Sequence, residues 1–257
     1  MRILVAIKPT LNVGQLKFEK DGTPMVDASP VTLGEADKCA IEEAMKVKEK
    51  MGAHVSVVSV GSSAAHYKVI RDAYAMGADY GYLVKVDGEV DALTVARLIV
   101  GVAKRTGPYD LLLMGSGAGD THSYLVGPMV AGLMELPLIA GVDRLEVSSD
   151  GLIRGTCRLE DGTYVYETRA PSVVTVTSEA NQPRIPGLKA VLRSKSARIE
   201  ELYPSDLGVE VKRLELGAPK KYEIPRKRIK LEATDPEAAA KAVEELLRAL
   251  KSGGVLS

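Results

Sequence analysis

The sequence predicts an α/β fold with a doubly wound, mostly parallel, Rossmann-like sheet. Short apolar runs rich in β-branched residues recur along the first half of the chain, and amphipathic helical patterns separate them. The fourth run leads directly into a glycine-rich segment at residues 110–128, DLLLMGSGAGDTHSYLVGP. Strands that alternate with helices indicate a parallel sheet covered on both faces. Such a sheet binds ligands beyond the carboxyl ends of its strands.

Each element of this half has its own local signal. The helical segments carry apolar residues at spacings of three and four, and the third opens at Asp91, a residue type that caps helices. We therefore expect ligands at the strand ends near residues 6–9, 60–62 and 115–120. The expected strands are residues 2–8, 54–60, 80–86 and 110–114, and the expected helices are residues 35–51, 64–76 and 91–104.

The pattern changes after residue 142. Four predicted strands follow one another up to Thr177, with Asp150-Gly151 and Asp161-Gly162 as hairpin turns, which indicates an antiparallel extension of the same sheet. Beyond Thr177 prolines interrupt the chain until a helical pattern at residues 234–251. The expected organisation is a nucleotide-binding domain at residues 1–180 and, at residues 181–257, a C-terminal arm that drapes over another subunit.

Composition excludes several classes of function. The 34 Lys and Arg balance the 34 Asp and Glu, so no overall field attracts nucleic acid. With no Trp and a single Phe there are few aromatic side chains for base stacking. Two distant cysteines suggest neither a redox pair nor a metal site, and no apolar run is long enough to span a membrane. We expect a cytoplasmic protein, and basic stretches at Lys189–Arg198 and Lys220–Lys230 that dock proteins.

The glycine-rich segment predicts an adenine nucleotide site. Gly115, Gly117 and Gly119 allow close approach to the backbone, and a following helix N-terminus favours phosphate. The neighbouring Asp120, Thr121 and Ser123 suit ribose and phosphate contacts better than acid–base chemistry. The segment matches neither GxGxxG nor the P-loop, so an ordinary helix capped by an Asp is the alternative.

The sequence allows two interpretations for each of three further side chains. Lys8 faces a phosphate or a flavin edge, or is a solvated strand end. Asp37 bonds a ribose hydroxyl, or only complements the dipole of its helix. His122 donates to a phosphate or a flavin carbonyl, or is a surface residue. The other histidines, His54 and His66, give no support for a metal triad or a Ser-His-Asp relay.

With these segments placed, the chain resembles the beta subunit of electron transfer flavoprotein. The resemblance covers residues 2 to about 209, and its most specific part is NQPRIPGLKAVLRSKSARI at residues 181–199. VAIKP, DKCAIEEAMKVKEK, VVSVG, AYAMGAD, the glycine-rich segment and APSVVTV also carry it. It implies a sheet of the adenine nucleotide alpha hydrolase type, and a heterodimer with an alpha subunit that carries its own FAD.

The resemblance also implies the ligand of the beta subunit, which is AMP as a structural group or, in electron-bifurcating members, a second FAD. Bifurcating members show GxxxxDxxTxQVGP; here Ser123 replaces the Thr and Leu125 replaces the Gln, and Gly34-Glu35 stands where many members have Asn-Pro. We favour FAD, with NADH as its electron donor, because the VGP is retained. Besides Lys8, the implied contacts are Ala6, Gly34, Glu35, Ala36, Asp37, Val60, Gly115, Ser116, Gly117, Ala118, Gly119, Asp120, Thr121, His122, Ser123, Tyr124, Leu125 and Val126.

By the same resemblance, one loop docks a dehydrogenase or a quinone oxidoreductase as redox partner, either free in the cytoplasm or in a membrane-bound complex. A small apolar anchor in a basic surround suits such transient association. The alternative function is a free-standing nucleotide-binding module of the universal-stress type, which would end with its sheet and lack an arm. The residues of the docking loop are Arg184, Ile185, Pro186, Gly187, Leu188, Lys189 and Arg193.

Overall fold

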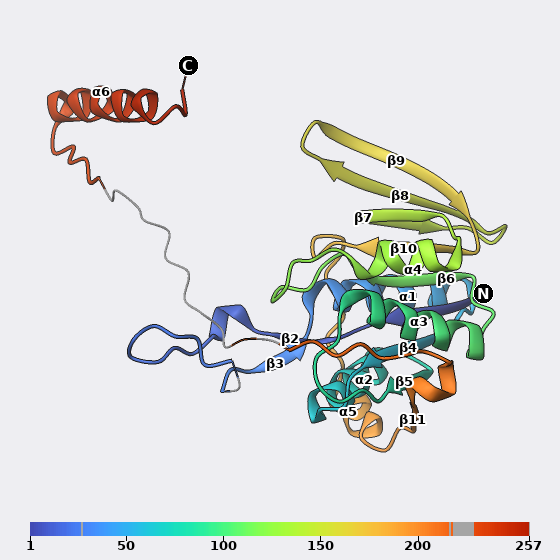
Figure 1. Cartoon of the computed structure of the whole chain (residues 1–257). Helices are drawn as coiled ribbons and strands as arrows, with labels where there is room; N and C mark the ends of the chain where they lie inside the picture. The colour runs from blue at the N-terminus through green and yellow to red at the C-terminus, as the bar shows by residue number, and fades with distance from the viewer. Residues whose placement is uncertain (27, 216, 218–228, 257) are drawn as a thin grey trace. The chain divides into compact units, whose positions relative to one another are not determined.

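A nine-stranded sheet with helices on both faces forms the first part of the chain (Figure 1). The structure is a computed structural model, and it describes residues 1–26, 28–215, 217 and 229–256. The chain divides into two compact units, Met1–Pro219 and Lys220–Ser257. The basic stretch Lys220–Lys230 lies outside the described residues except for its last two.

The sheet has the strand order β11-β5-β4-β1-β6-β10-β7-β8-β9. All of its neighbouring pairs are parallel from β11 to β7, while β8 is antiparallel to both β7 and β9. These strands are β1 (Arg2–Ala6), β4 (His54–Val60), β5 (Tyr80–Val84), β6 (Leu111–Gly115), β7 (Leu138–Val147), β8 (Leu152–Leu159), β9 (Gly162–Arg169), β10 (Ser172–Val176) and β11 (Ile199–Leu202). The fold class predicted from the sequence is therefore confirmed.

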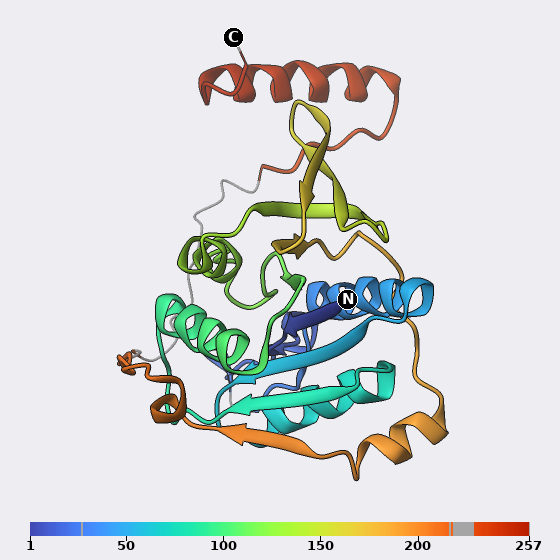
Figure 2. The same ribbon diagram turned by 90° about the vertical axis from the view of Figure 1, so that its right-hand side faces the viewer.

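Helices cover both faces of the sheet (Figure 2). A hydrophobic core lies on each face. Alternate residues of β1 supply both: Ile3 and Val5 face α1 and α2, and Leu4 faces α3 and α4. The helix signals read from the sequence were reliable, since the Asp91 carboxylate accepts the Thr94 N–H at 2.6 Å. The helices of this unit are α1 (Glu35–Met51), α2 (Ala64–Met76), α3 (Ala92–Thr106), α4 (Val126–Met134) and α5 (Leu188–Ser194), with two 3-10 turns, η1 (Val13–Gln15) and η2 (Pro204–Leu207).

The antiparallel extension was predicted correctly for β7, β8 and β9, but not for residues 172–176. These form β10, which lies between β6 and β7 and is parallel to both. All five of its residues are buried, as expected for a strand covered on both faces. The sequence of β10 shows that it is a strand, but a short apolar run does not indicate which strands it pairs with.

Part of the region expected to be an arm packs on the sheet instead. The strand β11 pairs in parallel with β5, and α5 packs against α2. The run IEEL carries two carboxylates and does not read as a strand, but Glu200 accepts the hydroxyl of Tyr80 at 2.7 Å and Glu201 accepts that of Tyr67. The hydrogen bonds from these two tyrosines stabilise the acidic segment as the edge strand of the sheet.

The second unit contains one helix, α6 (Pro236–Ser252), among its described residues. Asp235 caps it by accepting the Ala238 N–H at 2.8 Å, and the helix lies where the sequence predicted one. Val243, Leu246 and Leu247 are exposed. The helix is therefore amphipathic, with an apolar stripe that the described residues of its own unit do not bury.

A short hairpin lies beside the carboxyl ends of the parallel strands. Its strands are β2 (Pro9–Leu11) and β3 (Val31–Leu33), which pair antiparallel. The segment leads from the end of β1 to the start of α1. It therefore adds residues to the edge of the sheet where ligands are expected.

Close packing at the start of α4 gives a first testable result. A Cβ on Gly127 would lie 2.3 Å from Cγ2 of Thr175, which is buried in β10. We expect Gly127→Val to lower the free energy of unfolding by about 2 kcal/mol, because the methyl groups force α4 away from the sheet. Urea unfolding measures the effect, with Gly132→Val as the control because no atom lies within 4 Å of the added Cβ. Equal stability of the two variants would contradict the packing.

Candidate functional site

The carboxyl ends of three adjacent parallel strands meet at one edge of the sheet. β1 lies between β4 and β6, and Ala6 is paired with Val58 on one side and Met114 on the other. After β1, the next strands of this sheet, β4 and β5, are added on one side of β1, and β6 is then added on its opposite side. The gap between β1 and β6 is thus a topological switch point, where open α/β sheets bind ligands.

Asp37, in the first turn of α1, bridges this switch point. Its Oδ2 accepts the Lys8 N–H at 2.9 Å and its Oδ1 accepts the Gly115 N–H at 3.1 Å. Burial raises the pKa of Asp37 to about 6, although both backbone hydrogen bonds and the charge of Lys8 favour the ionised form. Each oxygen therefore accepts a hydrogen bond from within the chain, a role of Asp37 that the sequence did not reveal.

Lys8 and Asp120 form an ion pair across the same edge. The distance from Nζ to Oδ1 is 3.0 Å, and Asp120 Oδ2 also accepts the Leu11 N–H at 3.2 Å. The Asp120 side chain is only 14% exposed. Because α4 begins at Val126, Asp120 does not cap that helix, and the alternative reading of this carboxylate as an N-cap is wrong.

The loop between β6 and α4 has a constrained backbone. His122 and Tyr124 adopt φ values of 45° and 54°, which cost about 1–2 kcal/mol for residues with side chains. A Cβ on Gly117 would lie 2.8 Å from the Tyr124 ring, so this glycine makes room for the tyrosine. Strained residues often gather where a loop is shaped for a ligand.

The hydroxyl of Thr10 is an additional polar group at this edge. It is buried, and its oxygen has no hydrogen-bond partner among the described residues. A Cβ on Gly34 would lie 3.0 Å from this oxygen. An unused hydroxyl beside a glycine and the open loop suits a polar ligand, so the residues present fit the adenine nucleotide predicted from the sequence.

His66 is a neighbour of this site that the sequence did not reveal. Its Nδ1 lies 2.8 Å from Ser63 Oγ, and its ring covers Gly61, which has a φ of 145°. Burial, and secondarily the charge of Lys8, lower the pKa of His66. The sequence did contain a signal for this position. Because α2 begins just after β4, its first turn, which contains His66, lies at the carboxyl edge of the sheet.

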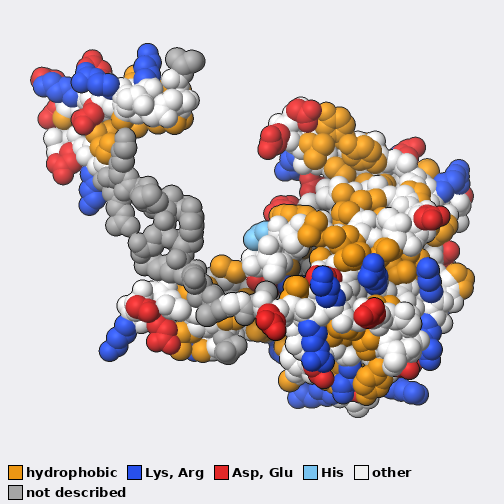
Figure 3. All heavy atoms as spheres, viewed as in Figure 1, with side chains coloured by type: hydrophobic (Ala, Val, Ile, Leu, Met, Phe, Trp, Pro, Cys, Tyr) orange, Lys and Arg blue, Asp and Glu red, His pale blue; other side chains and the backbone are white. Residues whose placement is uncertain are grey.

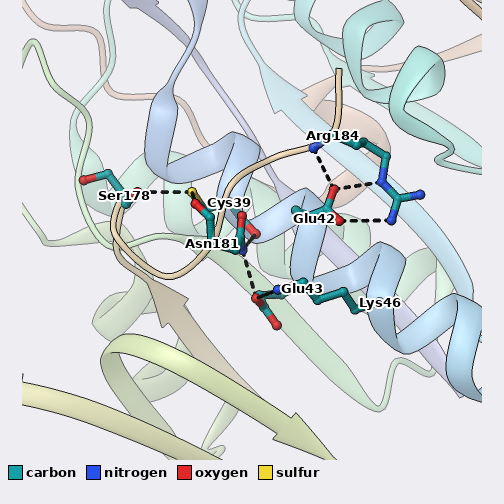
Figure 4. A network of polar contacts seen from close by, with 7 residues as sticks. All are labelled: Cys39, Glu42, Glu43, Lys46, Ser178, Asn181 and Arg184. Carbon is teal, nitrogen blue, oxygen red and sulfur yellow. Dashed lines mark hydrogen bonds and ion pairs between the residues drawn. The ribbon is translucent and has the colours of Figure 1, made fainter. Parts of the chain in front are cut away.

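A second cluster fastens the segment after β10 to α1 (Figure 4). The Arg184 side chain donates to Glu42 Oε2 at 2.8 Å and to Glu49 Oε1 at 2.6 Å. Asn181 Nδ2 donates to the Cys39 carbonyl at 3.0 Å and to Glu43 Oε1 at 2.9 Å. The predicted docking residue Arg184 is therefore an internal ion-pair partner.

The residues that follow Arg184 are presented to solvent. Ile185 is 93% exposed and Leu188 is 76% exposed, and Lys189 and Arg193 are exposed beside them. Lys and Arg side chains lie among apolar ones over the region of α2 and α5 (Figure 3). A groove of about 590 Å³ separates this segment from α1 and α2. The exposed apolar and basic residues form a surface suited to a protein partner.

Two classes of site are absent from the part of the chain that the structure describes. It contains no group of three or more His, Cys, Asp and Glu side chains arranged to hold a metal ion. None of the helices within that part has the length and apolar character needed to cross a membrane.

Comparison with known proteins gives consistent matches. Residues 25–207 match the electron transfer flavoprotein domain family. The chain is 30% identical over 220 residues to electron transfer flavoprotein subunit beta of Thermoanaerobacterium thermosaccharolyticum, which covers 84% of this chain and 83% of that protein. It is 32% identical over 214 residues to the subunit of the same name of Bradyrhizobium diazoefficiens, with coverage of 82% and 85%. The corresponding protein of Bacillus subtilis is 29% identical over 254 residues, with coverage of 96% and 98%.

Proposed function

Since the chain belongs to the electron transfer flavoprotein family, and its relatives are beta subunits, we propose that it binds an adenine nucleotide and docks redox partners within a heterodimer. The other member is an alpha subunit that carries FAD. The observation that carries the nucleotide proposal is the switch point between β1 and β6, with Lys8, Thr10 and the loop after Gly115 around it. Family membership disfavours the alternative of a free-standing universal-stress module.

The binding edge offers distinct groups for the parts of a nucleotide. The backbone N–H groups of residues 117–120 and 123–126 and the Lys8 ammonium suit phosphate, while the first turn of α1 and Val60 flank the adenosine. The Thr10 hydroxyl is free to bond a polar atom of the ligand. These groups serve AMP and the AMP half of FAD equally, because both present the same adenosine and phosphate.

We favour FAD as the ligand of this subunit, as in the electron-bifurcating type. When bound, FAD would accept hydride from NADH and deliver its electrons singly to two acceptors. Leu125 is exposed and has no side-chain hydrogen bond to offer, so the surrounding backbone and the nearby hydroxyls must hold the flavin. With AMP in its place, the subunit would serve as a scaffold and a docking surface in the cytoplasm.

The proposed docking surface consists of Ile185–Lys189 and Arg193, which are exposed except for the half-buried Pro186. Leu188 and Ile185 supply the apolar anchor, and Lys189 and Arg193 steer an acidic surface on a dehydrogenase or a quinone oxidoreductase. Arg184 contributes by holding the start of this surface on α1. Transient electron-transfer contacts need only a small apolar centre of this kind.

The nucleotide content of the purified heterodimer tests the proposal. After denaturation, we expect two FAD per heterodimer, separated and quantified by chromatography; one FAD and one AMP would assign the scaffold role instead. Gly117→Val should lower the second nucleotide at least fivefold, since the new side chain displaces Tyr124 within the loop. Gly162→Val is the matched control, because no atom lies within 4 Å of its added Cβ. A heterodimer with one FAD and no other adenine nucleotide would refute a nucleotide site in this chain.

A further inference from the structure

A single side chain bridges the two strands at the switch point. The ladder between β1 and β6 ends at the pair Ala6 and Met114. Beyond it, the N–H groups of Lys8 and Gly115 point to Asp37 instead of to the neighbouring strand. One carboxylate thus continues the connection between the two strands at the place where their direct pairing stops.

We propose that Asp37 is the positioning residue of the nucleotide site, which holds Lys8 and the loop after Gly115 in register without touching the nucleotide. The inference rests on the proposed function and adds how the same site is organised. Lys8 carries the charge offered to the phosphate, and Gly115 begins the loop whose N–H groups surround it. A change of the distance between these two segments would misplace both groups together.

The packing around Gly115 supports this role. A Cβ at this position would lie 2.5 Å from Asp37 Oδ1 and 2.9 Å from the Ala36 Cβ. The missing side chain therefore makes room for the first turn of α1, and not for the ligand. Glycine is needed here so that the carboxylate can reach the backbone of β6.

The charges around Asp37 make the bridge sensitive to pH. Lys8, beyond β1, favours the carboxylate, and Asp120, in the loop after β6, disfavours it; Glu35 and Lys38 flank it on α1. An ionised carboxylate accepts on both oxygens, whereas the protonated group carries a hydrogen on one of them. Since burial raises the pKa of Asp37 to about 6, the bridge weakens as the pH falls below this value.

Binding of AMP to the heterodimer, freed of nucleotide in this subunit, tests the proposal by equilibrium dialysis between pH 5 and 8. Asp37→Asn should bind AMP at least tenfold more weakly at pH 7, because the amide offers one acceptor oxygen and places an N–H₂ against a backbone N–H. The matched control is Asp161→Asn, the same substitution at an exposed aspartate in the turn between β8 and β9, which should bind like the wild type. The phosphate of AMP also titrates in this range, so the pH profile of the variant is compared with that of the wild type.

The wild type should lose more affinity than Asp37→Asn between pH 7 and pH 5. Identical pH profiles, or an affinity of the variant within twofold of the wild type at pH 7, would overturn the proposal. Amide hydrogen exchange at Lys8 and Gly115 in the nucleotide-free protein gives a separate measure. If the wild type binds neither AMP nor FAD, the proposed function fails, and faster exchange at these two amides in Asp37→Asn still decides whether the bridge exists.

Discussion

A chain that ends at Pro219 will keep its sheet and its nucleotide site but will not assemble with the alpha subunit. The reason is that α6 carries the apolar residues Val243, Leu246 and Leu247 on one stripe, and the described residues of its own unit do not cover them. An amphipathic helix of this kind is stabilised when its apolar stripe packs against another surface. Co-purification with a tagged alpha subunit measures the loss, which we expect to be at least tenfold.

The position of the cut decides whether the experiment is interpretable. A cut at residue 200 would remove most of β11, which belongs to the sheet, so loss of assembly could follow from a damaged edge. Cutting after Pro219 follows the division between the two units. In the full chain, Leu246→Asn should reproduce much of the defect, and Glu244→Asn, an exposed polar residue on the same helix, should not. Normal assembly of the truncated chain would exclude the arm as the anchor.

Arg184→Ala is expected to lower the free energy of unfolding by about 2–3 kcal/mol. The substitution leaves Glu42, whose side chain is only 9% exposed, without its main partner. The value is below the 3–5 kcal/mol typical of a fully buried pair, because the Arg184 side chain is 32% exposed and solvent screens the interaction. Chemical denaturation at pH 7 measures the effect. A loss below 0.5 kcal/mol would show that the ion pair adds little.

The pH dependence of this loss follows from Glu42. Burial raises the pKa of this carboxyl, but hydrogen bonds and charge from Arg184 outweigh burial and hold it below its ordinary value. The ion pair therefore stabilises the fold fully above the pKa of the unfolded chain, and the contribution is lost as the pH falls through the lower folded pKa. The difference between wild type and Arg184→Ala should shrink under acid conditions. Arg193→Ala is the control, since this exposed residue should affect docking and leave stability unchanged.

The sequence predicted α1, α2 and α3 and most strands of the first unit correctly. α1 and α2 have the predicted bounds, Glu35–Met51 and Ala64–Met76. Their signals are local, since apolar spacing, a first-turn acid and a following glycine all lie within one segment. β11 was missed because its acidic residues depend on tyrosines from other elements.

The candidate site was predicted less completely than the fold. The three strand ends that the switch-point rule selected do lie side by side. The sequence did not reveal that the Asp37 carboxylate accepts the Gly115 N–H, or that the guanidinium of Arg184, which the resemblance assigned to a partner, is held by α1. A side chain shows its chemical type in the sequence, while its partner is revealed only by the packed structure.

The amino-acid sequence determined by itself most of the helices and strands of the first unit and the family to which the chain belongs, because those signals lie within short runs of neighbouring residues. The tertiary structure alone decided what Asp37 and Arg184 do. Their partners Gly115 and Glu42 are 78 and 142 positions away along the chain. Separations of this length leave no periodic pattern, and such contacts form only when the helix α1 is laid against the finished sheet.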